Sequence, residues 1–319
     1  NWIDISTNYS KRGYSTFLKR LSFYGRKWRK LFLFNGGKIK LNLEIPFQYY
    51  IFYFRQGYHI FKNLSSKKDV LSIKFQDILV GDLIYDTYLR YNTKPTINIK
   101  DKFLLRIIIS SIYIYNKSQK YFESNDIDLF FTSYASYSHH GIVARLALKK
   151  QIKVISLGSH EKLFNIIKPE FPYHLVNFSH YKRDSCRLND AFKEKFITES
   201  RRLLQNRLNG KIDPSLSYMN KSTFVKYDMD KTFFIKNKKP KVIIWSHDFF
   251  DSPHVRGWLL FEDYFEWLKF ILVSADTESN DYFVKVHPNS SVSNLNVINN
   301  LLIKFAKIRL IPKSISTNQ

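Results

Sequence analysis

The chain has 319 residues and a formal net charge of +24, which arises from 51 lysine and arginine residues against 27 aspartate and glutamate residues. This length suffices for two ordinary α/β domains. The single cysteine, Cys186, excludes an intrachain disulfide and is typical of a protein from a reducing compartment. Because no apolar run approaches the roughly 18–20 residues that span a bilayer, the composition predicts a cytoplasmic protein without a transmembrane helix.

The positive charge is compatible with three kinds of partner: nucleic acid, an anionic membrane surface, or anionic small molecules. A fourth interpretation is compositional, because lysine, asparagine, isoleucine, tyrosine and phenylalanine are all abundant, as in proteins from AT-rich genomes. The basic residues are scattered apart from the stretch Lys19 to Lys30, and the sequence lacks the motifs of common nucleic-acid-binding modules. We therefore expect no nucleic-acid partner.

The first predicted element, Phe17 to Phe34, interleaves lysine and arginine with aromatic residues. Two interpretations stay open for it. An amphipathic element that rests on anionic lipid would place the protein on the inner face of the cytoplasmic membrane. Alternatively, the segment is a surface helix whose aromatic residues face the core. An aromatic run, Ile45 to Phe54, and a short strand, Ser72 to Phe75, follow.

The next predicted element, Ile78 to Arg90, carries Asp82, Asp86 and Arg90 at intervals of four residues. On a helix these three side chains share one face, and Asp86 is in position to pair with Arg90. The alternative roles are structural: a helix cap for Asp82 and a surface ion pair for Asp86. A second helix is predicted from Phe103 to Phe122, where apolar residues recur at helical spacing.

A β-α-β unit is predicted next, with strands at Ile127 to Ser133 and Lys153 to Leu157 and a helix at Gly141 to Lys150. The turn from the first strand into the helix carries His139 and His140. Such a turn is a usual position for site residues, although capping of the helix would explain the same residues.

An amphipathic helix from Phe192 to Leu208 is followed by a polar, irregular stretch from Lys211 to Pro240. We interpret that stretch as an interdomain connection. It divides the chain into an N-terminal Rossmann-like domain, residues 1–235, and a partial C-terminal domain, residues 236–319.

The second domain begins with another predicted β-α-β unit, with strands at Val242 to Trp245 and Tyr282 to Val284 around a helix at Phe261 to Ser274. A third short strand is predicted at Ile308 to Pro312. Because the chain does not start with methionine and the sheet holds only three strands, we expect a missing N-terminus and an incomplete C-terminal domain.

Polar residues follow the strands of this second unit, at the edge where open α/β sheets bind ligands. Histidine and lysine beside free backbone N–H groups suit a phosphate or diphosphate. Turn formation and a backbone-satisfied edge histidine are the structural alternatives. The candidate phosphate-binding residues are His247, Asp248, Ser252, His254, Lys285 and His287.

Several blocks of the chain resemble one family. The blocks are Val80 to Arg90, His140 to Lys149, His247 to His254, Phe261 to Trp267 and Lys285 to Pro288. Together they are similar to the capsule-synthesis glycosyltransferases of bacteria, a group that includes the Kdo (3-deoxy-D-manno-octulosonic acid) transferases and related sialic-acid-type enzymes. The resemblance covers roughly residues 70 to 312.

The resemblance implies an α/β protein of GT-B type, in which two Rossmann-like domains face a cleft. The N-terminal domain would lie on the acceptor side, and the C-terminal domain would bind the nucleotide-sugar. It implies transfer of a sugar, first Kdo or another nonulosonate from a CMP donor, to a glycan or lipid-linked acceptor of capsule or lipopolysaccharide. No metal or other cofactor is expected.

The same resemblance implies roles for individual residues. Asp82 or Asp86 would act as base or nucleophile, and Arg90 would hold the sugar carboxylate. His140 is a further catalytic candidate. Lys285, His287 and His254 would neutralise the leaving phosphate. The alternatives are a non-catalytic glycan-binding or assembly protein that keeps the fold and a basic nucleic-acid-binding protein.

Overall fold

A computed structural model gives the fold of the chain. It describes residues 2–4, 39–42, 47–159, 162–175, 185–212, 222, 224, 233–234, 237–257, 259–313 and 315. The basic aromatic segment Phe17 to Phe34 lies outside the described residues, so its two interpretations both stay open.

The protein is a mixed α/β protein, as the sequence predicts, and it forms two compact units. Unit 1 contains Asn1–Leu175 and the short segment Phe250–Glu262, and unit 2 contains Val176–Phe249 and Asp263–Gln319. This division differs from the predicted boundary at residues 235 and 236, because the chain enters unit 2 already after Leu175 and returns to unit 1 for Phe250–Glu262.

Unit 1 is dominated by helices. The α6 helix starts at Asp101, whose side chain accepts a hydrogen bond from the Phe103 amide, and α4 starts at a capping box formed by Ser66 and Asp69. The long α6 confirms the helix predicted from Phe103 to Phe122. The helices of unit 1 are α3 (Phe47–Lys62), α4 (Lys67–Leu71), α5 (Gly81–Asn92), α6 (Lys102–Glu123), α7 (Tyr137–Lys149) and the 3₁₀ turn η2 (Pro253–Arg256).

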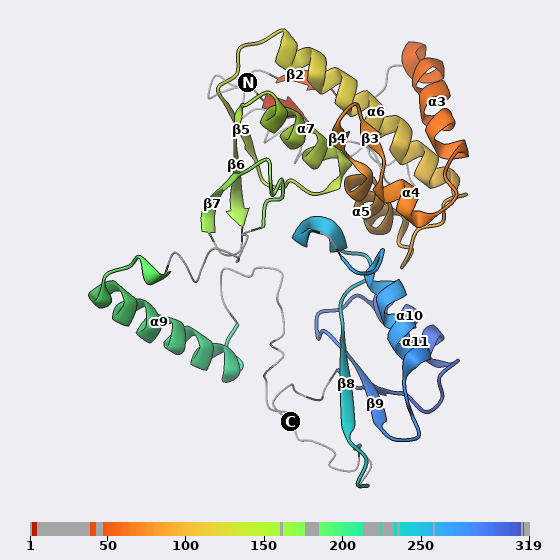
Figure 1. Cartoon of the computed structure of the whole chain (residues 1–319), viewed down its shortest axis with the longest axis vertical. Helices are drawn as coiled ribbons and strands as arrows, with labels where there is room; N and C mark the ends of the chain where they lie inside the picture. The colour runs from red at the N-terminus through yellow and green to blue at the C-terminus, as the bar shows by residue number, and fades with distance from the viewer. Residues whose placement is uncertain are drawn as a thin grey trace, which may run out of the picture. The chain divides into compact units, whose positions relative to one another are not determined.

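Small sheets complete unit 1 (Figure 1). The predicted β-α-β unit is present: β5 and β6 are parallel and α7 connects them, while β7 returns antiparallel beside β6. Two other pairs are parallel β1–β2 and antiparallel β3–β4. The strands are β1 (Trp2–Asp4), β2 (Ile39–Asn42), β3 (Lys74–Phe75), β4 (Ile78–Leu79), β5 (Leu129–Thr132), β6 (Lys153–Ser159) and β7 (Lys162–Ile167).

The core of unit 1 lies among α5, α6 and α7, and α5 is buried along almost its whole length. Its residues Leu83, Ile84, Tyr85, Tyr88 and Leu89 are each no more than 1 % exposed. A helix buried in this way is in contact with neighbouring elements on nearly all sides. Any charged side chain on α5 that points into this core needs a partner there.

Unit 2 is built around a three-stranded parallel sheet with strand order β10-β9-β8. The chain alternates strand and helix through it, as the sequence predicts, although the helix after β9 was not predicted. Within the described residues, no helix is long and apolar enough to cross a membrane. The elements of unit 2 are α9 (Asp190–Leu208), β8 (Lys241–Ser246), α10 (Tyr264–Ser274), β9 (Asp281–Val286), α11 (Val292–Leu302) and β10 (Arg309–Ile311).

Candidate functional site

The buried start of α5 is fixed by a close contact with the turn that precedes it. The amides of Val80 and Gly81 both donate to the Ile73 carbonyl, at 2.9 and 3.0 Å. A Cβ atom at position 81 would lie 2.1 Å from the carbonyl oxygen of Val70, so only glycine fits. This contact sets where the following residue, Asp82, enters the protein.

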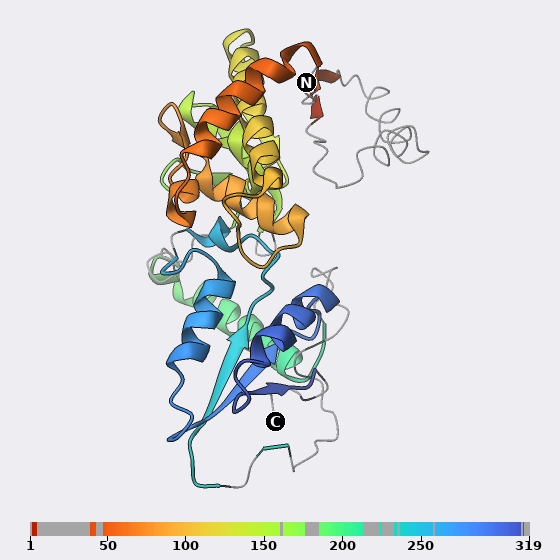
Figure 2. The same ribbon diagram turned by 90° about the vertical axis from the view of Figure 1, so that its right-hand side faces the viewer.

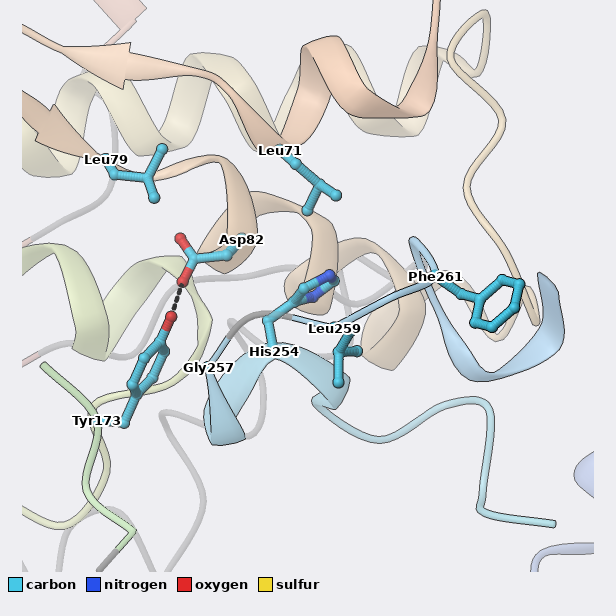
Figure 3. Close-up of a pocket in the computed structure, with 8 residues that line it drawn as sticks. All are labelled: Leu71, Leu79, Asp82, Tyr173, His254, Gly257, Leu259 and Phe261. Atoms are coloured by element: carbon cyan, nitrogen blue, oxygen red, sulfur yellow. Dashed lines mark hydrogen bonds between the residues drawn. The ribbon is translucent and has the colours of Figure 1, made fainter. Parts of the chain in front are cut away.

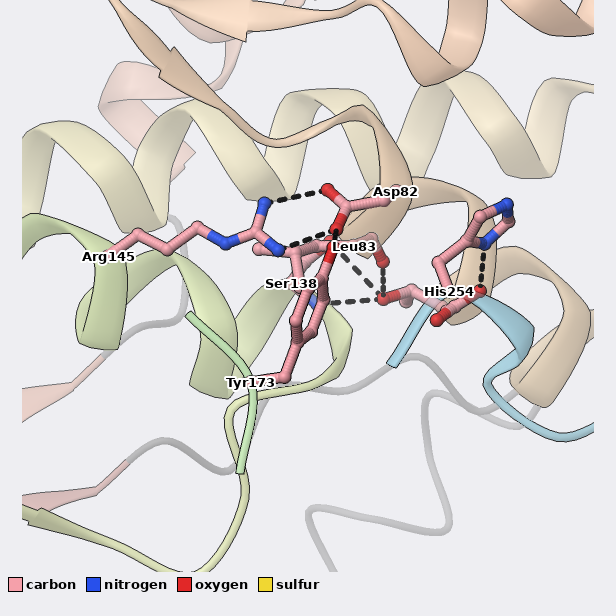
Figure 4. A network of polar contacts seen from close by, with 8 residues as sticks. Asp82, Leu83, Ser138, Arg145, Tyr173 and His254 are labelled. Atoms are coloured by element: carbon pink, nitrogen blue, oxygen red, sulfur yellow. Dashed lines mark hydrogen bonds and ion pairs between the residues drawn. The ribbon is translucent and has the colours of Figure 1, made fainter. Parts of the chain in front are cut away.

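Asp82 is almost completely buried and is held by an arginine and a tyrosine (Figure 4). The Arg145 guanidinium donates to both carboxylate oxygens, at 2.7 and 2.5 Å, and the Tyr173 hydroxyl donates at 2.9 Å. Burial, the largest single effect, would raise the pKa of Asp82, but the charge and hydrogen bonds of Arg145, together with His254 and Tyr173, outweigh it and the pKa is lowered. Asp82 is therefore an ionised carboxylate at neutral pH.

Arg145 reaches Asp82 because α7 packs closely on α5. At Gly141, one turn before Arg145, a Cβ atom would come within 2.4 Å of the Leu83 side chain. The two helices are also joined by a hydrogen bond from the Ser138 amide to the Thr87 hydroxyl, at 2.8 Å. The glycine thus permits the approach that lets the arginine fork form two parallel bonds.

Asp86, one turn after Asp82, forms the second buried pair, and its partner is His254. The distance between Asp86 Oδ1 and His254 Nδ1 is 2.6 Å, and the two residues are 2 % and 5 % exposed. Burial raises the pKa of Asp86 to about 6, against the opposing effect of His254. At pH 7 the carboxylate form prevails and orients the imidazole through Nδ1.

The segment that carries His254 is locked into unit 1. Pro253 starts the 3₁₀ turn η2, which contacts α5, and Gly257 ends it with φ of 97°, a conformation that favours glycine. The Tyr137 hydroxyl of α7 is hydrogen-bonded to Ser252. Edge-on contact with Tyr85, at 5.0 Å between ring centroids, fixes the His254 ring.

A pocket opens beside these two pairs (Figure 3). Asp82, Tyr173 and His254 are its polar residues, and the rest of its wall is mainly apolar. A few polar groups in an apolar wall are the kind of lining found in small-molecule sites, and the volume of this cavity is about 40 Å³. The lining residues are Leu71, Leu79, Asp82, Tyr173, His254, Gly257, Leu259 and Phe261.

The other two catalytic candidates lie apart from this arrangement. Arg90 is on α5 but its side chain is exposed. In the described part of the chain the ion-pair partner of Asp86 is His254, so the Asp86–Arg90 pair expected from the spacing is not formed. His140 lies in the first turn of α7, which begins at Tyr137, earlier than predicted. Burial lowers the pKa of His140 to about 4, so its ring is neutral at pH 7.

The predicted phosphate-binding residues divide between the two units. Ser252 and His254 belong to unit 1, and the other four belong to unit 2. In unit 2, His247 follows β8 and His287 follows β9, as predicted for neighbouring parallel strands. Partial burial, and then the charges of His247, Arg207 and Lys313, lower the pKa of His287. The charge of Asp248, at the same edge, opposes this effect.

All four of those residues already have protein partners. His287 Nδ1 accepts a hydrogen bond from the Asn289 amide at 3.2 Å, and His247 Nδ1 lies 3.4 Å from the Asp248 carbonyl oxygen. Asp248 accepts a hydrogen bond from the Ser291 hydroxyl at the start of α11, at 3.3 Å. Lys285 is 3 % exposed, and its ammonium donates to the carbonyl groups of Pro312 and Ile315. The predicted phosphate contact from Lys285 would require these two bonds to be given up.

Sequence reasoning missed two residues of the site. Arg145 falls within the block His140 to Lys149, and its distance of one helical turn from a glycine was the available signal. No sequence signal marked Tyr173, because it follows β7 in an irregular stretch. His254 was identified, but as a phosphate ligand and not as the partner of Asp86.

No family model, curated protein or solved structure matches the chain. The chemistry of the site is therefore argued from its geometry. Among the described residues, no group of three or more histidine, cysteine, aspartate or glutamate side chains could hold a metal ion. A buried carboxylate–imidazole pair beside a pocket can accept and return a proton, and the arginine-bound carboxylate next to it supplies a fixed negative charge.

Proposed function

We propose that the protein is a glycosyltransferase that uses a nucleotide-activated sugar in the synthesis of bacterial capsule or lipopolysaccharide. The first candidate donor is CMP-Kdo or another CMP-linked nonulosonate, and the acceptor is a glycan or a lipid-linked glycan. The finer fold assignment, a GT-B enzyme with two Rossmann-like domains, is part of this proposal. A β-α-β unit in each of the two units supports it.

The observation that carries the proposal is the bond between Asp86 and His254. The two residues lie 168 positions apart, in two blocks that each resemble the glycosyltransferase family. A surface ion pair or a capped turn would not bring these blocks together in a buried, oriented pair at a pocket. An acid–base site does need such a pair, because the carboxylate holds one ring nitrogen and directs the other.

In the proposed reaction, the acceptor hydroxyl attacks the anomeric carbon of the donor sugar. The bond from that carbon to the phosphate oxygen breaks, and CMP leaves with the electron pair. His254 accepts the hydroxyl proton at Nε2, and Asp86 stabilises the imidazolium that forms through its bond to Nδ1. Because the Asp86 pKa is about 6, transfer should decline below that pH as the carboxylate is protonated.

This assignment separates the two aspartates, which the sequence leaves as equivalent candidates. Both oxygens of Asp82 are engaged by Arg145, and one also accepts the Tyr173 hydroxyl. We assign Asp82 to positioning and Asp86 to proton transfer. The phosphate of the donor is assigned to His247 and His287 in unit 2, which follow the neighbouring parallel strands β8 and β9.

The test is turnover with a panel of donors. Purified protein is incubated with CMP-, UDP- and GDP-sugars and a glycan acceptor, and free nucleotide and extended glycan are measured by mass spectrometry. The proposal predicts extension with a CMP-sugar. Glycan binding by calorimetry without turnover on any donor would favour the non-catalytic alternative, and neither turnover nor binding would remove the glycan assignment.

A further inference from the structure

Exposed aromatic side chains lie around much of the α3 helix. The exposed fractions of six of its apolar and aromatic side chains run from 39 % at Phe54 to 68 % at Ile51. The exposed apolar and aromatic residues are Tyr49, Tyr50, Ile51, Phe52, Phe54 and Tyr58. Single exposed aromatic residues are common, but a contiguous set of this size on one helix marks an interaction surface.

Three of these rings form an ordered row. Tyr50 stacks on Phe54 with 6.4 Å between ring centroids, and Phe54 stacks on Tyr58 at 5.8 Å. They recur at intervals of four residues, so they lie along one line of the helix. The row presents a rigid aromatic surface that loses little side-chain entropy when it binds a partner.

The side of α3 that carries Tyr53 and Gly57 is firmly attached to unit 1. Gly57 packs so closely on α6 that a Cβ atom would lie 2.5 Å from an Ile109 side-chain carbon. Tyr53 meets Tyr113 edge to face, at 5.2 Å between centroids. The aromatic row runs beside this contact and its rings are 39–48 % exposed, on the helix that crosses in front of α6 (Figure 2).

The charged side chains of α3, and of α6 before its last residue, are all basic. The α3 sequence contains no acidic residue, and its Arg55 and Lys62 are exposed. In α6, the only carboxylate is Glu123, the last residue of the helix, which pairs with Lys150 at 3.8 Å.

Four exposed basic residues of α6 flank α3. At 100° per residue they fall within about 60° of the line through Ile109 and Tyr113, the residues that α3 covers. They therefore emerge on the same side of unit 1 as α3. These residues are Lys102, Arg106, Lys117 and Lys120.

We propose that the aromatic face of α3, flanked by these basic side chains, is a membrane-docking surface that lies in the headgroup region of an anionic phospholipid bilayer. Tyrosine and phenylalanine favour this region because their rings are apolar and the tyrosine hydroxyl stays in contact with water. Lysine and arginine at the border attract anionic lipid. The proposal does not depend on the glycosyltransferase assignment, because it concerns a different surface and a different partner.

The positive charge of the α3 surface favours a membrane over a second copy of the chain as its partner. Two copies meeting through this face would bring like charges together, six from each copy over α3 and α6. Anionic lipid instead neutralises them. The chain as a whole, at +24, also favours a negatively charged partner.

The test is co-sedimentation of the full chain with vesicles of phosphatidylcholine alone and of phosphatidylcholine with phosphatidylglycerol. The variant carries Tyr50→Ser, Phe54→Ser and Tyr58→Ser. The matched control carries Phe192→Ser, Phe196→Ser and Leu203→Ser, which also removes three exposed apolar side chains, from α9. We expect the α3 variant to lose tenfold or more in partitioning to anionic vesicles and the α9 control to bind as the wild type does.

Equal binding of wild type and α3 variant to anionic vesicles would overturn the proposal and leave the segment Phe17 to Phe34 as the membrane contact. Equal loss in both variants would also overturn it, because the effect would then be one of general surface hydrophobicity. If analytical ultracentrifugation finds a dimer that the α3 variant abolishes, and vesicle binding is unchanged, a second copy is the occupant instead.

A second readout reports the surface directly. Cys186 is the only cysteine and is exposed, so Cys186→Ser gives a background in which Phe54→Cys or Phe196→Cys carries an environment-sensitive fluorophore. We expect a blue shift with anionic vesicles at position 54 and none at position 196. The absence of a shift at position 54 contradicts the proposal even if sedimentation is observed.

Discussion

Replacing Asp82 by asparagine should destabilise the protein strongly, although the change keeps the shape of the side chain. Asp82 and Arg145 are 7 % and 6 % exposed in their side chains, and the guanidinium donates to both carboxylate oxygens. The substitution would leave Arg145 as a buried charge without its counter-ion. Breaking a buried pair in this way costs about 3–5 kcal/mol, a large part of the roughly 5–15 kcal/mol that stabilises a typical domain.

The assay is urea unfolding followed by circular dichroism, with Asp77→Asn as the control. Asp77 forms an ion pair with Lys149, but both side chains are exposed, so its loss should change stability little. Arg145→Met combined with Asp82→Asn should cost less than the sum of the two single changes, because no lone charge then remains. A loss below about 1 kcal/mol for Asp82→Asn, or additive single losses, would refute the reasoning.

Three further predictions concern other parts of the structure. Burial raises the pKa of Asp86 to about 6, so between about pH 4 and pH 6 the folded protein binds a proton that the unfolded chain releases. The free energy of unfolding should therefore fall as pH rises through this window. Asp86→Asn should flatten this pH dependence, measured by urea unfolding at a series of pH values. Gly81→Ala places a Cβ atom 2.1 Å from the Val70 carbonyl and should lower stability by at least about 1–3 kcal/mol, measured by thermal unfolding; an unchanged melting temperature would show that the turn relaxes easily. His287→Ala should weaken nucleotide binding by about 1.5–3 kcal/mol at an unchanged melting temperature, and equal affinity by calorimetry would remove His287 from the site.

The regular elements could be predicted from the sequence because their apolar spacing is strong. The helix over Phe103 to Phe122 and the parallel strands around residues 242 and 282 are confirmed by α6, β8 and β9. The helix α11 was missed because its sequence, VSNLNVINNLL, is rich in asparagine and serine, which depress helix propensity. The aromatic run from Ile45 to Phe54 gave no clear period, since its exposed face is as apolar as its buried one.

The site was predictable in its residue types but not in its pairings. Four-residue spacing placed Asp82 and Asp86 on one helical face, as α5 confirms. The same spacing favoured Arg90 as the partner of Asp86, because sequence reveals only local neighbours. The actual partners, Arg145 and His254, come from distant parts of the chain and depend on how α7 and η2 pack on α5.

The most direct test of the central claim, that Asp86 and His254 form the acid–base pair for sugar transfer, is the rate of product formation by His254→Gln under saturating donor and acceptor. The account predicts a loss of about 10²-fold or more, the usual contribution of a general base, with nucleotide affinity retained in calorimetry. It also predicts that the rise in wild-type rate near pH 6 disappears in this variant. Transfer at the wild-type rate by His254→Gln would contradict the claim.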